Sequence, residues 1–219
     1  MKPVFISKDP QELHAALHQL CAEGVLTAQS LLSYSPVSFT CQPTFDLVFF
    51  ASIRAAEFYL AQCAAPAIFG VAGSETALKI EQKFGLKAAF VAQNSGNPTQ
   101  EATAFNHWRA NRSVLFPSSS LSLGTYSKLI PEQQKKILPV YQTNFMQQRI
   151  DAHQVYVFSS PSNVSAFFET NHLAENAQII AWGKSTEKAL KDLGIAVTHT
   201  LLKDQQTELL QWLKAANFY

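Results

Sequence analysis

One block of the sequence, in which a strand pattern leads into a helix pattern and both then repeat, occurs twice in the chain. The later copy covers residues 154–190, where a β-branched and aromatic run ends in small polar residues before a helical period. In the earlier copy, Ser52 and Gly73 align with Ser160 and Gly183 at nearly the same separation. A near-constant separation over such a block indicates an internal repeat. We therefore expect two related α/β units.

Each copy places polar groups at the carboxyl ends of neighbouring strands. Backbone N–H groups and small hydroxyl residues stand there, at the starts of the helices that follow. A further strand over 113–116 ends in the same way, running into Pro117 and a serine-rich loop. Open α/β sheets hold anionic ligands at this edge, because helix N-termini carry partial positive charge. The pattern predicts a site for an anionic small molecule.

Composition narrows the class of protein. A chain of 219 residues that is 47% hydrophobic and 15% charged can bury one large core or two smaller ones, and the repeat favours two. A net charge of +1 provides no basic field for nucleic acid, which we exclude as a partner. The opening residues lack a signal-peptide core, and no apolar run approaches the ~20 residues of a membrane span. We expect a soluble, cytoplasmic protein that does not bind membranes.

The cysteines suggest neither a metal site nor catalysis. Cys21, Cys41 and Cys63 are odd in number and have no spacing typical of metal ligands. We interpret all three as reduced, structural thiols. No metal is expected.

The order of the elements predicts how the two units are connected. An opening strand at 4–6 and its helix do not make a domain alone, whereas extended segments at 31–39 and 136–143 each contain a proline and match in character. If these two segments pair, the opening piece completes the sheet of the later copy. The first α/β domain is then discontinuous, residues 1–36 and 146–219, and residues 37–145, linker strands included, form the second.

The repeat copies and the segments between them resemble the uroporphyrinogen-III synthase family. In chain order the matching pieces are VFFAS, GVAGSETAL, LFPSSS, PVYQT, VFSSPSNV and AWGKSTEKALKDLGI, which together span nearly the whole sequence. The resemblance implies an α/β protein with two flavodoxin-like or Rossmann-like parallel-sheet domains, joined by a two-stranded linker, with the substrate in the cleft between them. It implies no cofactor and no metal.

Members of this family are lyases of haem biosynthesis. They close hydroxymethylbilane, a linear tetrapyrrole rich in carboxylates, to uroporphyrinogen III with inversion of ring D and loss of water. Without the enzyme, the azafulvene that forms when the terminal hydroxyl leaves closes to the symmetric isomer. The resemblance thus implies hydroxymethylbilane as the small-molecule substrate and a transient contact with hydroxymethylbilane synthase. A monomer is the default expectation.

The resemblance also assigns roles to individual residues. The tyrosine of the family's linker pattern falls on Tyr141. A free phenol has a pKa of ~10 and can donate a proton at neutral pH, so a tyrosine suits the role of an acid. The resemblance leaves open whether Tyr141 is an acid catalyst or only positions substrate. Substrate-binding hydroxyls fall on Ser52, Thr76, Ser118, Ser119, Ser160, Ser185 and Thr186.

Each of these hydroxyls also suits a second role. Those at helix starts are typical N-caps, and one residue can both cap a helix and bind a ligand. Ser118 and Ser119 stand where many members carry arginine and glycine, so carboxylate contacts there would come from hydroxyls and backbone. Lys184 replaces a common proline.

Two other functions share the same expected fold. Two α/β lobes with a hinge also describe a non-catalytic receptor that clamps a small anion. A regulatory protein that kept the fold and lost the activity is the other alternative. Turnover of hydroxymethylbilane separates both from the enzyme.

Overall fold

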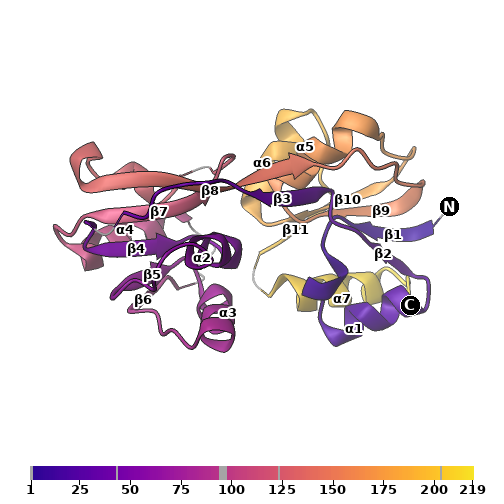
Figure 1. The fold of residues 1–219 in the computed structure, drawn as a ribbon. Coiled ribbons are helices and arrows are strands. Elements are labelled where there is room, and N and C mark those ends of the chain that lie inside the picture. The colour runs from indigo at the N-terminus through magenta and orange to yellow at the C-terminus, as the bar shows by residue number, and fades with distance from the viewer. Residues whose placement is uncertain (1, 43, 94–97, 123, 203) are drawn as a thin grey trace. The chain divides into compact units, whose positions relative to one another are not determined.

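The computed structural model describes residues 2–42, 44–93, 98–122, 124–202 and 204–219. The chain divides into two compact units, one of Met1–Ser33 with Asn144–Tyr219 and the other of Tyr34–Thr143. Each unit contains a parallel sheet with helices, and the sheet of the first is built from both ends of the chain (Figure 1). The predicted fold class is confirmed.

Both crossings between the units lie in neighbouring strands, β3 (Leu32–Pro36) and β8 (Lys135–Phe145). The Met146 amide donates to the Leu31 carbonyl at 2.8 Å, and the Val37 amide to the Val140 carbonyl at 3.1 Å. These two bonds run in opposite order along the two strands, so the pair is antiparallel. β3 is an edge strand, where proline is tolerated, and Pro36 is its last residue. Pro139 lies inside β8, next to a β-bulge.

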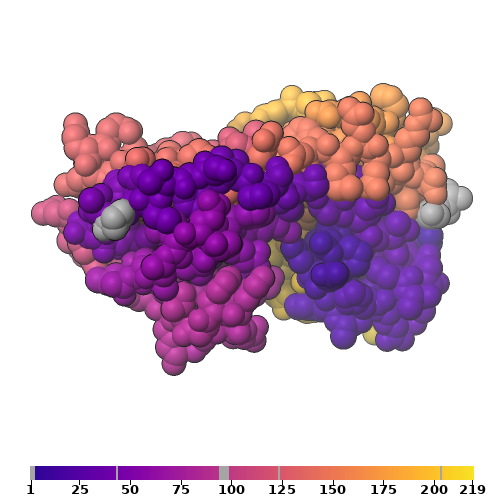
Figure 2. All heavy atoms as spheres, in the orientation of Figure 1, coloured from indigo at the N-terminus to yellow at the C-terminus, as the bar shows by residue number. Residues whose placement is uncertain are grey.

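The first unit has a five-stranded sheet in the order β11-β10-β9-β1-β2, with every pair parallel. Its strands are β1 (Lys2–Ile6), β2 (Leu26–Ala28), β9 (His153–Phe158), β10 (Gln178–Trp182) and β11 (His199–Leu201). In Figure 2 the indigo N-terminal residues lie against the orange and yellow C-terminal residues within this unit. β1 pairs with β2 on one side and β9 on the other, so the strand order reverses there.

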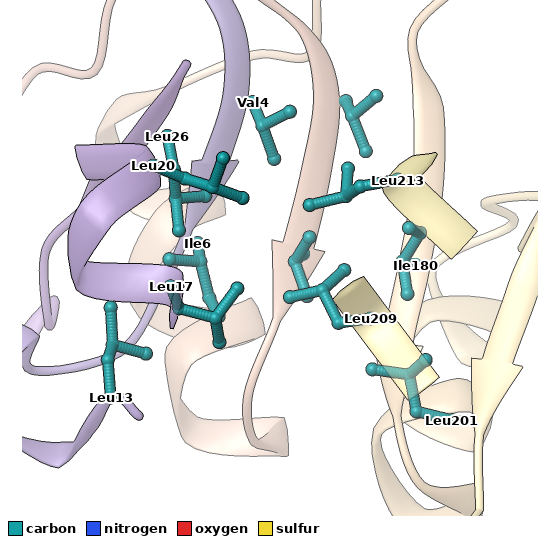
Figure 3. Packing of buried hydrophobic residues seen from close by; sticks show 12 residues of the cluster. Val4, Ile6, Leu13, Leu17, Leu20, Leu26, Ile180, Leu201, Leu209 and Leu213 are labelled. Atoms are coloured by element: carbon teal, nitrogen blue, oxygen red, sulfur yellow. The ribbon is translucent and has the colours of Figure 1, made fainter. Parts of the chain in front are cut away.

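Helices cover both faces of this sheet. On one face, α1 (Ala15–Ala22) and α7 (Gln205–Ala215) direct leucines onto Val4 and Ile6 of β1 (Figure 3). The ring of Phe5, between those two residues, lies on the opposite face, with its centroid 6.3 Å from that of Phe167. Phe167 belongs to α5 (Pro161–Thr170), which contacts α6 (Lys184–Asp192). Burial on both faces explains the continuous apolar runs of the strands.

The second unit has the order β3-β8-β7-β4-β5-β6, parallel from β8 to β6. Here Phe50 packs with α2 and α3, whereas Phe49 packs with α4. Short 3₁₀ turns lie at Ser127–Leu129 and Glu132–Gln134 in this unit, and at Pro10–Glu12 in the first unit. The remaining elements are β4 (Leu47–Phe50), α2 (Ile53–Leu60), β5 (Phe69–Val71), α3 (Ser74–Phe84), β6 (Phe90–Val91), α4 (Pro98–Arg109) and β7 (Val114–Ser119). Within the described ranges, no helix is both long and apolar enough to cross a membrane.

The repeat is visible in the caps of the helices. Ser52 caps α2 and Ser160 caps α5, each accepting a backbone N–H bond of 3.2 Å three residues further on. The second helix of each copy begins instead at a glycine, Gly73 or Gly183, without a side-chain cap. Gly183 has a φ of 93°, a conformation that side chains with a Cβ rarely adopt. The two copies thus share their local structure as well as their sequence pattern.

One expectation about the cysteines is wrong. Cys41 and Cys63 form a disulfide, with their Cα atoms 5.8 Å apart, and only Cys21 is a free thiol. The sequence separation of 22 residues gave no signal, because the two meet only where the segment after β3 returns to the end of α2. Disulfides are typical of oxidising compartments. The cytoplasmic location stays a prediction, and a thiol count of freshly isolated protein tests it.

Candidate functional site

The strand ends of the second unit hold several of the predicted residues on one edge. Ser52 follows β4, and Thr76 lies in the first turn of α3, after β5. Ser118 and Ser119 end β7, and Tyr141 of β8 pairs with Ser119. Since these strands are parallel neighbours, their carboxyl ends meet at the same edge of the sheet. The structure therefore brings Ser118, Ser119 and Tyr141 together on adjacent strands.

A β-bulge separates the two serines of β7. Ser118 pairs with Pro139 and Ser119 with Tyr141, so Val140 has no partner in the β7 ladder. The Ser119 hydroxyl is engaged, with its Oγ 2.8 Å from the Oγ1 of Thr143. Bulges commonly re-aim side chains beside active sites. Both serines line the cavity described next, but of the two hydroxyls only that of Ser119 is hydrogen-bonded to a described residue.

A cavity of about 490 Å³ opens where β7 ends. Its walls include the aromatic residues Phe49 and Phe116, and the prolines Pro117 and Pro139. Ser118 lines this cavity and is only 8% exposed, and its Oγ has no hydrogen-bond partner among the described residues. Buried hydroxyls are nearly always paired, so this one is an exception that requires an explanation.

A phenol and a carboxylate also line the cavity. The Tyr126 hydroxyl donates to Oε2 of Glu101 at 2.9 Å. Burial, and then the bond to Glu101, raise the pKa of Tyr126 well above its ordinary value, so the phenol stays a donor. Sequence reasoning missed both residues, because the turn-rich segment that carries Tyr126 gave no sign of returning to α4.

Tyr141 lies in an aromatic cluster on the other face of the same sheet. Its ring is 8% exposed and stacks on Phe58, with centroids 5.1 Å apart and planes 17° apart. Tyr34 meets it edge-on at 5.8 Å, and the guanidinium carbon of Arg54 lies 4.2 Å from the Tyr34 centroid. No described residue bonds the Tyr141 hydroxyl. The ring is held in place while its hydroxyl remains available.

In the first unit, the polar residues at the strand reversal bond to one another. Asn163 donates through Nδ2 to both Ser159 and Ser160 at 3.1 Å, and its Oδ1 accepts from the Leu31 amide at 3.0 Å. Ser7 accepts from the Ser159 amide at 2.9 Å, and the Ser159 hydroxyl donates to the Ser7 carbonyl. Ser160 therefore belongs to a connected network. Ser7 and Asn163 were not predicted.

The first turn of α6 contains the other predicted residues. Thr186 is 1% exposed, and its hydroxyl donates to the Trp182 carbonyl at 3.3 Å, whereas Ser185 is exposed. Lys8 Nζ lies 5.5 Å from the Trp182 ring centroid and 2.8 Å from Glu12. Because α6 has no side-chain cap, its first amides remain available to a ligand, as do those of α3.

The potential metal ligands among the described residues do not cluster. In the described part of the chain, no three His, Cys, Asp or Glu side chains gather so that they could hold a metal ion. Cys41 and Cys63 bond to each other and offer no thiolate. Among the described residues, the groups beside the strand ends include hydroxyls, backbone amides, Lys8 and, from α4, the Glu101 carboxylate.

These features define a two-domain α/β protein, with the sheet of its first domain built from both chain ends and with polar groups at its strand ends. Comparison with known families then agrees with the resemblance noted in the sequence. The family whose sequence model is described as "Uroporphyrinogen-III synthase HemD" matches residues 11–200 of this chain. The chain belongs to the uroporphyrinogen-III synthase family.

Solved structures agree on the fold. The uroporphyrinogen-III synthetase of Helicobacter pylori is 17% identical, with 97% of this chain and 100% of that chain covered, at a TM-score of 0.66. A mutant uroporphyrinogen III synthase from Thermus thermophilus is 13% identical, with 99% and 98% covered, at 0.61. No curated protein matches the sequence. At these identities the likeness concerns the fold alone.

Proposed function

We propose that the protein is a uroporphyrinogen-III synthase, which closes hydroxymethylbilane to uroporphyrinogen III with inversion of ring D and loss of water. The observation that carries the proposal is the family match over residues 11–200. In the same proposal the enzyme needs no cofactor, works as a monomer and takes its substrate from hydroxymethylbilane synthase in a transient contact.

The strand ends offer the donors that a polyanion needs. The uncapped first turns of α3 and α6 present backbone amides, beside the hydroxyls of Thr76 and Ser185. A hydrogen bond to a charged group contributes about 1.5 to 3 kcal/mol. Several such bonds to different carboxylates would hold the pyrrole rings of the substrate in one arrangement.

Capping and substrate binding are compatible for Ser52 and Ser160. As caps, both hydroxyls accept hydrogen bonds through Oγ, from Ala55 and from Asn163. A hydroxyl also carries one proton that it can donate. Each serine can therefore cap its helix and donate to a carboxylate. Thr186 already donates to Trp182, so its contribution would come from its backbone amide.

Tyr141 is assigned the acid role. Its phenol donates a proton to the terminal hydroxyl, and the carbon–oxygen bond breaks with loss of water to leave an azafulvene. The substituted carbon of ring D attacks the azafulvene, and the bond from that carbon to the ring C bridge then breaks. The bridge re-forms at the free α-carbon of ring D, which inverts the ring, and the proton lost from that carbon restores the phenol. The stacked ring on Phe58 supports this assignment because a positioned donor contributes more than a mobile one. A bias of ~4 kcal/mol between the two closures would make the symmetric isomer about one product in a thousand.

The test is a coupled assay that reports the product isomer. Porphobilinogen and hydroxymethylbilane synthase generate the substrate in place, and chromatography of the oxidised porphyrins separates isomers I and III. We expect predominantly isomer III when this protein is present and isomer I when it is omitted. Isomer I alone in both samples would overturn the proposal and leave a binding or regulatory protein of the same fold.

A further inference from the structure

The cavity at the end of β7 has the size and position of a ligand site. At about 490 Å³ it lies within the range of small-molecule pockets. It is lined by residues that end or follow β4, β5 and β7, among them Ala51, Ala72 and Ser118. Because β4 pairs with both β5 and β7, the strand order reverses there, which is where α/β sheets hold ligands.

The lining favours a flat, uncharged ring. Phe49 forms one wall with Phe116 and Tyr126, at centroid distances of 5.7 and 4.4 Å, and aromatic faces of this kind pack well against a planar ligand. The described lining contains no Lys, Arg or His. Its other polar residues, besides Glu101 and Tyr126, are serines and one threonine. A ligand carboxylate would thus enter a largely apolar cavity with hydroxyls but no cationic side chain to pair with it.

The polar groups of the cavity point to a hydrogen-bond donor on that ring. The Ser118 hydroxyl is buried without a partner among the described residues. Glu101 contributes a carboxylate, an acceptor held by the phenol of Tyr126 at 2.9 Å. A ligand N–H can donate to either oxygen-bearing group, whereas a ligand carboxylate would be repelled by Glu101.

We propose that this cavity binds a neutral, planar N–H heterocycle of the pyrrole type, with Ser118 as a hydrogen-bonding partner. Its further identification as the site for one pyrrole ring of hydroxymethylbilane rests on the proposed function. In that reading the cavity recognises a ring, and the substrate carboxylates bind elsewhere, at the helix starts. The cavity then helps to fix the position of the chain of pyrroles before closure.

The experiment uses three probes of matched shape on the full-length protein. Indole has the ring N–H, indene lacks it, and indole-3-carboxylate adds a charge. Titrations followed by the backbone amide signals of residues 116, 118–122 and 124–127 give an affinity for each probe; Pro117 has no amide proton. We expect indole to bind about fivefold more tightly than indene, which corresponds to the net contribution of one hydrogen bond to affinity. Indole-3-carboxylate should bind more weakly than indene.

Ser118→Ala assigns the hydrogen bond. This variant should remove most of the preference for indole over indene, while Ser165→Ala, the same change at an exposed position of α5, should leave it intact. The three probes on the unaltered protein form a test of their own that does not depend on how well the variant folds. Equal affinities of indole and indene, a carboxylate that binds as tightly as indole, or no signal change in these residues would overturn the proposal.

The outcome is separable from that of the isomer assay. A preference for indole together with isomer I alone would keep the heterocycle site and overturn the synthase. Isomer III without a preference for indole would keep the synthase and overturn the site.

Discussion

In both units the strand order reverses beside strands with the same sequence pattern. The two reversals differ in how the polar groups there are hydrogen-bonded. In the first unit, Asn163 bonds Ser159, Ser160 and the Leu31 amide, so the polar groups at the reversal are largely satisfied by one another. In the second unit, Ser118 lies buried beside a cavity of about 490 Å³ with no described partner. The repeat sets strands, helices and caps alike in both. The groups that a strand end offers to a ligand therefore depend on residues that the two copies do not share.

The units also differ in their chemistry. The N-caps Ser52 and Ser160 are equivalent, but the phenol proposed as the acid, on Tyr141, belongs to β8 of the second unit. The described strand ends of the first unit carry hydroxyls, Lys8 and the amides of α6. Under the proposed function, the first unit would only bind the substrate, whereas the second would bind it and donate the proton.

The largest expected effect tests that division of roles. Tyr141→Phe removes the proton donor and keeps the ring stacked on Phe58, so kcat for hydroxymethylbilane should fall about 100-fold or more with little change in KM. Tyr59→Phe, which removes a hydroxyl from the same apolar cluster, is the matched control and should retain its activity. If Tyr141→Phe stays within about threefold of the parent rate, the acid role is wrong and positioning controls the reaction.

The disulfide allows the stability of the two units to be separated. Replacing Cys41 and Cys63 by serine should destabilise the second unit by about 3 kcal/mol, because the bond restrains the unfolded chain. Hydrogen exchange, read amide by amide, should show faster opening of residues 44–93 and unchanged opening of the first unit. Cys21→Ser is the control in the first unit. Equal loss of protection in both units would show that they unfold as one.

The polar network of the first unit should be more costly to disturb than any cap. Asn163→Ala leaves the Leu31 amide buried without its acceptor and removes two bonds to Ser159 and Ser160. We expect a loss of about 2 kcal/mol in the free energy of unfolding, measured by urea titration. Asn163→Asp keeps the acceptor for Leu31 and should lose less. A loss under about 0.5 kcal/mol would contradict the importance of this network.

Local sequence patterns predicted much of the fold. Apolar runs located β4, β7, β9 and β10, although not β2 or β11. Ser52, Ser160 and Gly183 marked the starts of helices, because caps and positive φ depend on neighbouring residues alone. Pro36 predicted the edge position of β3, although Pro139 lies within β8, which has a neighbouring strand on both sides. Caps and turns are short-range features, whereas the pairing of β3 with β8 was inferred from the matching character of two distant segments.

The remainder depends on contacts between distant segments. Ser7 meets Ser159 only because β1 and β9 pair, and Tyr126 reaches Glu101 only because its loop folds back to α4. The disulfide was missed for the same reason. For Thr186, the sequence predicted a helix-start hydroxyl, but its depth of burial follows from how α6 packs. Its role in binding stays a prediction.

The smallest expected effect is a gain in stability, whereas the other stability changes predicted above are losses. It tests directly whether the strand ends of the two units differ in hydrogen bonding. A buried hydroxyl without a partner costs about 1 to 3 kcal/mol relative to one that is bonded, so Ser118→Ala should stabilise the second unit slightly, by about 0.5 kcal/mol. The loss of small packing contacts offsets the rest of the gain. Ser160→Ala, which removes a bonded cap in the first unit, should destabilise it by about 1 kcal/mol.

Thermal unfolding of the two variants and the parent protein shows whether each substitution raises or lowers the unfolding temperature. A rise for Ser118→Ala and a fall for Ser160→Ala would mean that the second unit keeps an unsatisfied hydroxyl at the expense of stability, as sites that bind ligands often do. If Ser118→Ala instead destabilises as much as Ser160→Ala, the hydroxyl already has a partner such as an ordered water. The strand ends of the two units would then be alike in hydrogen bonding, and they would differ only in the space beside them.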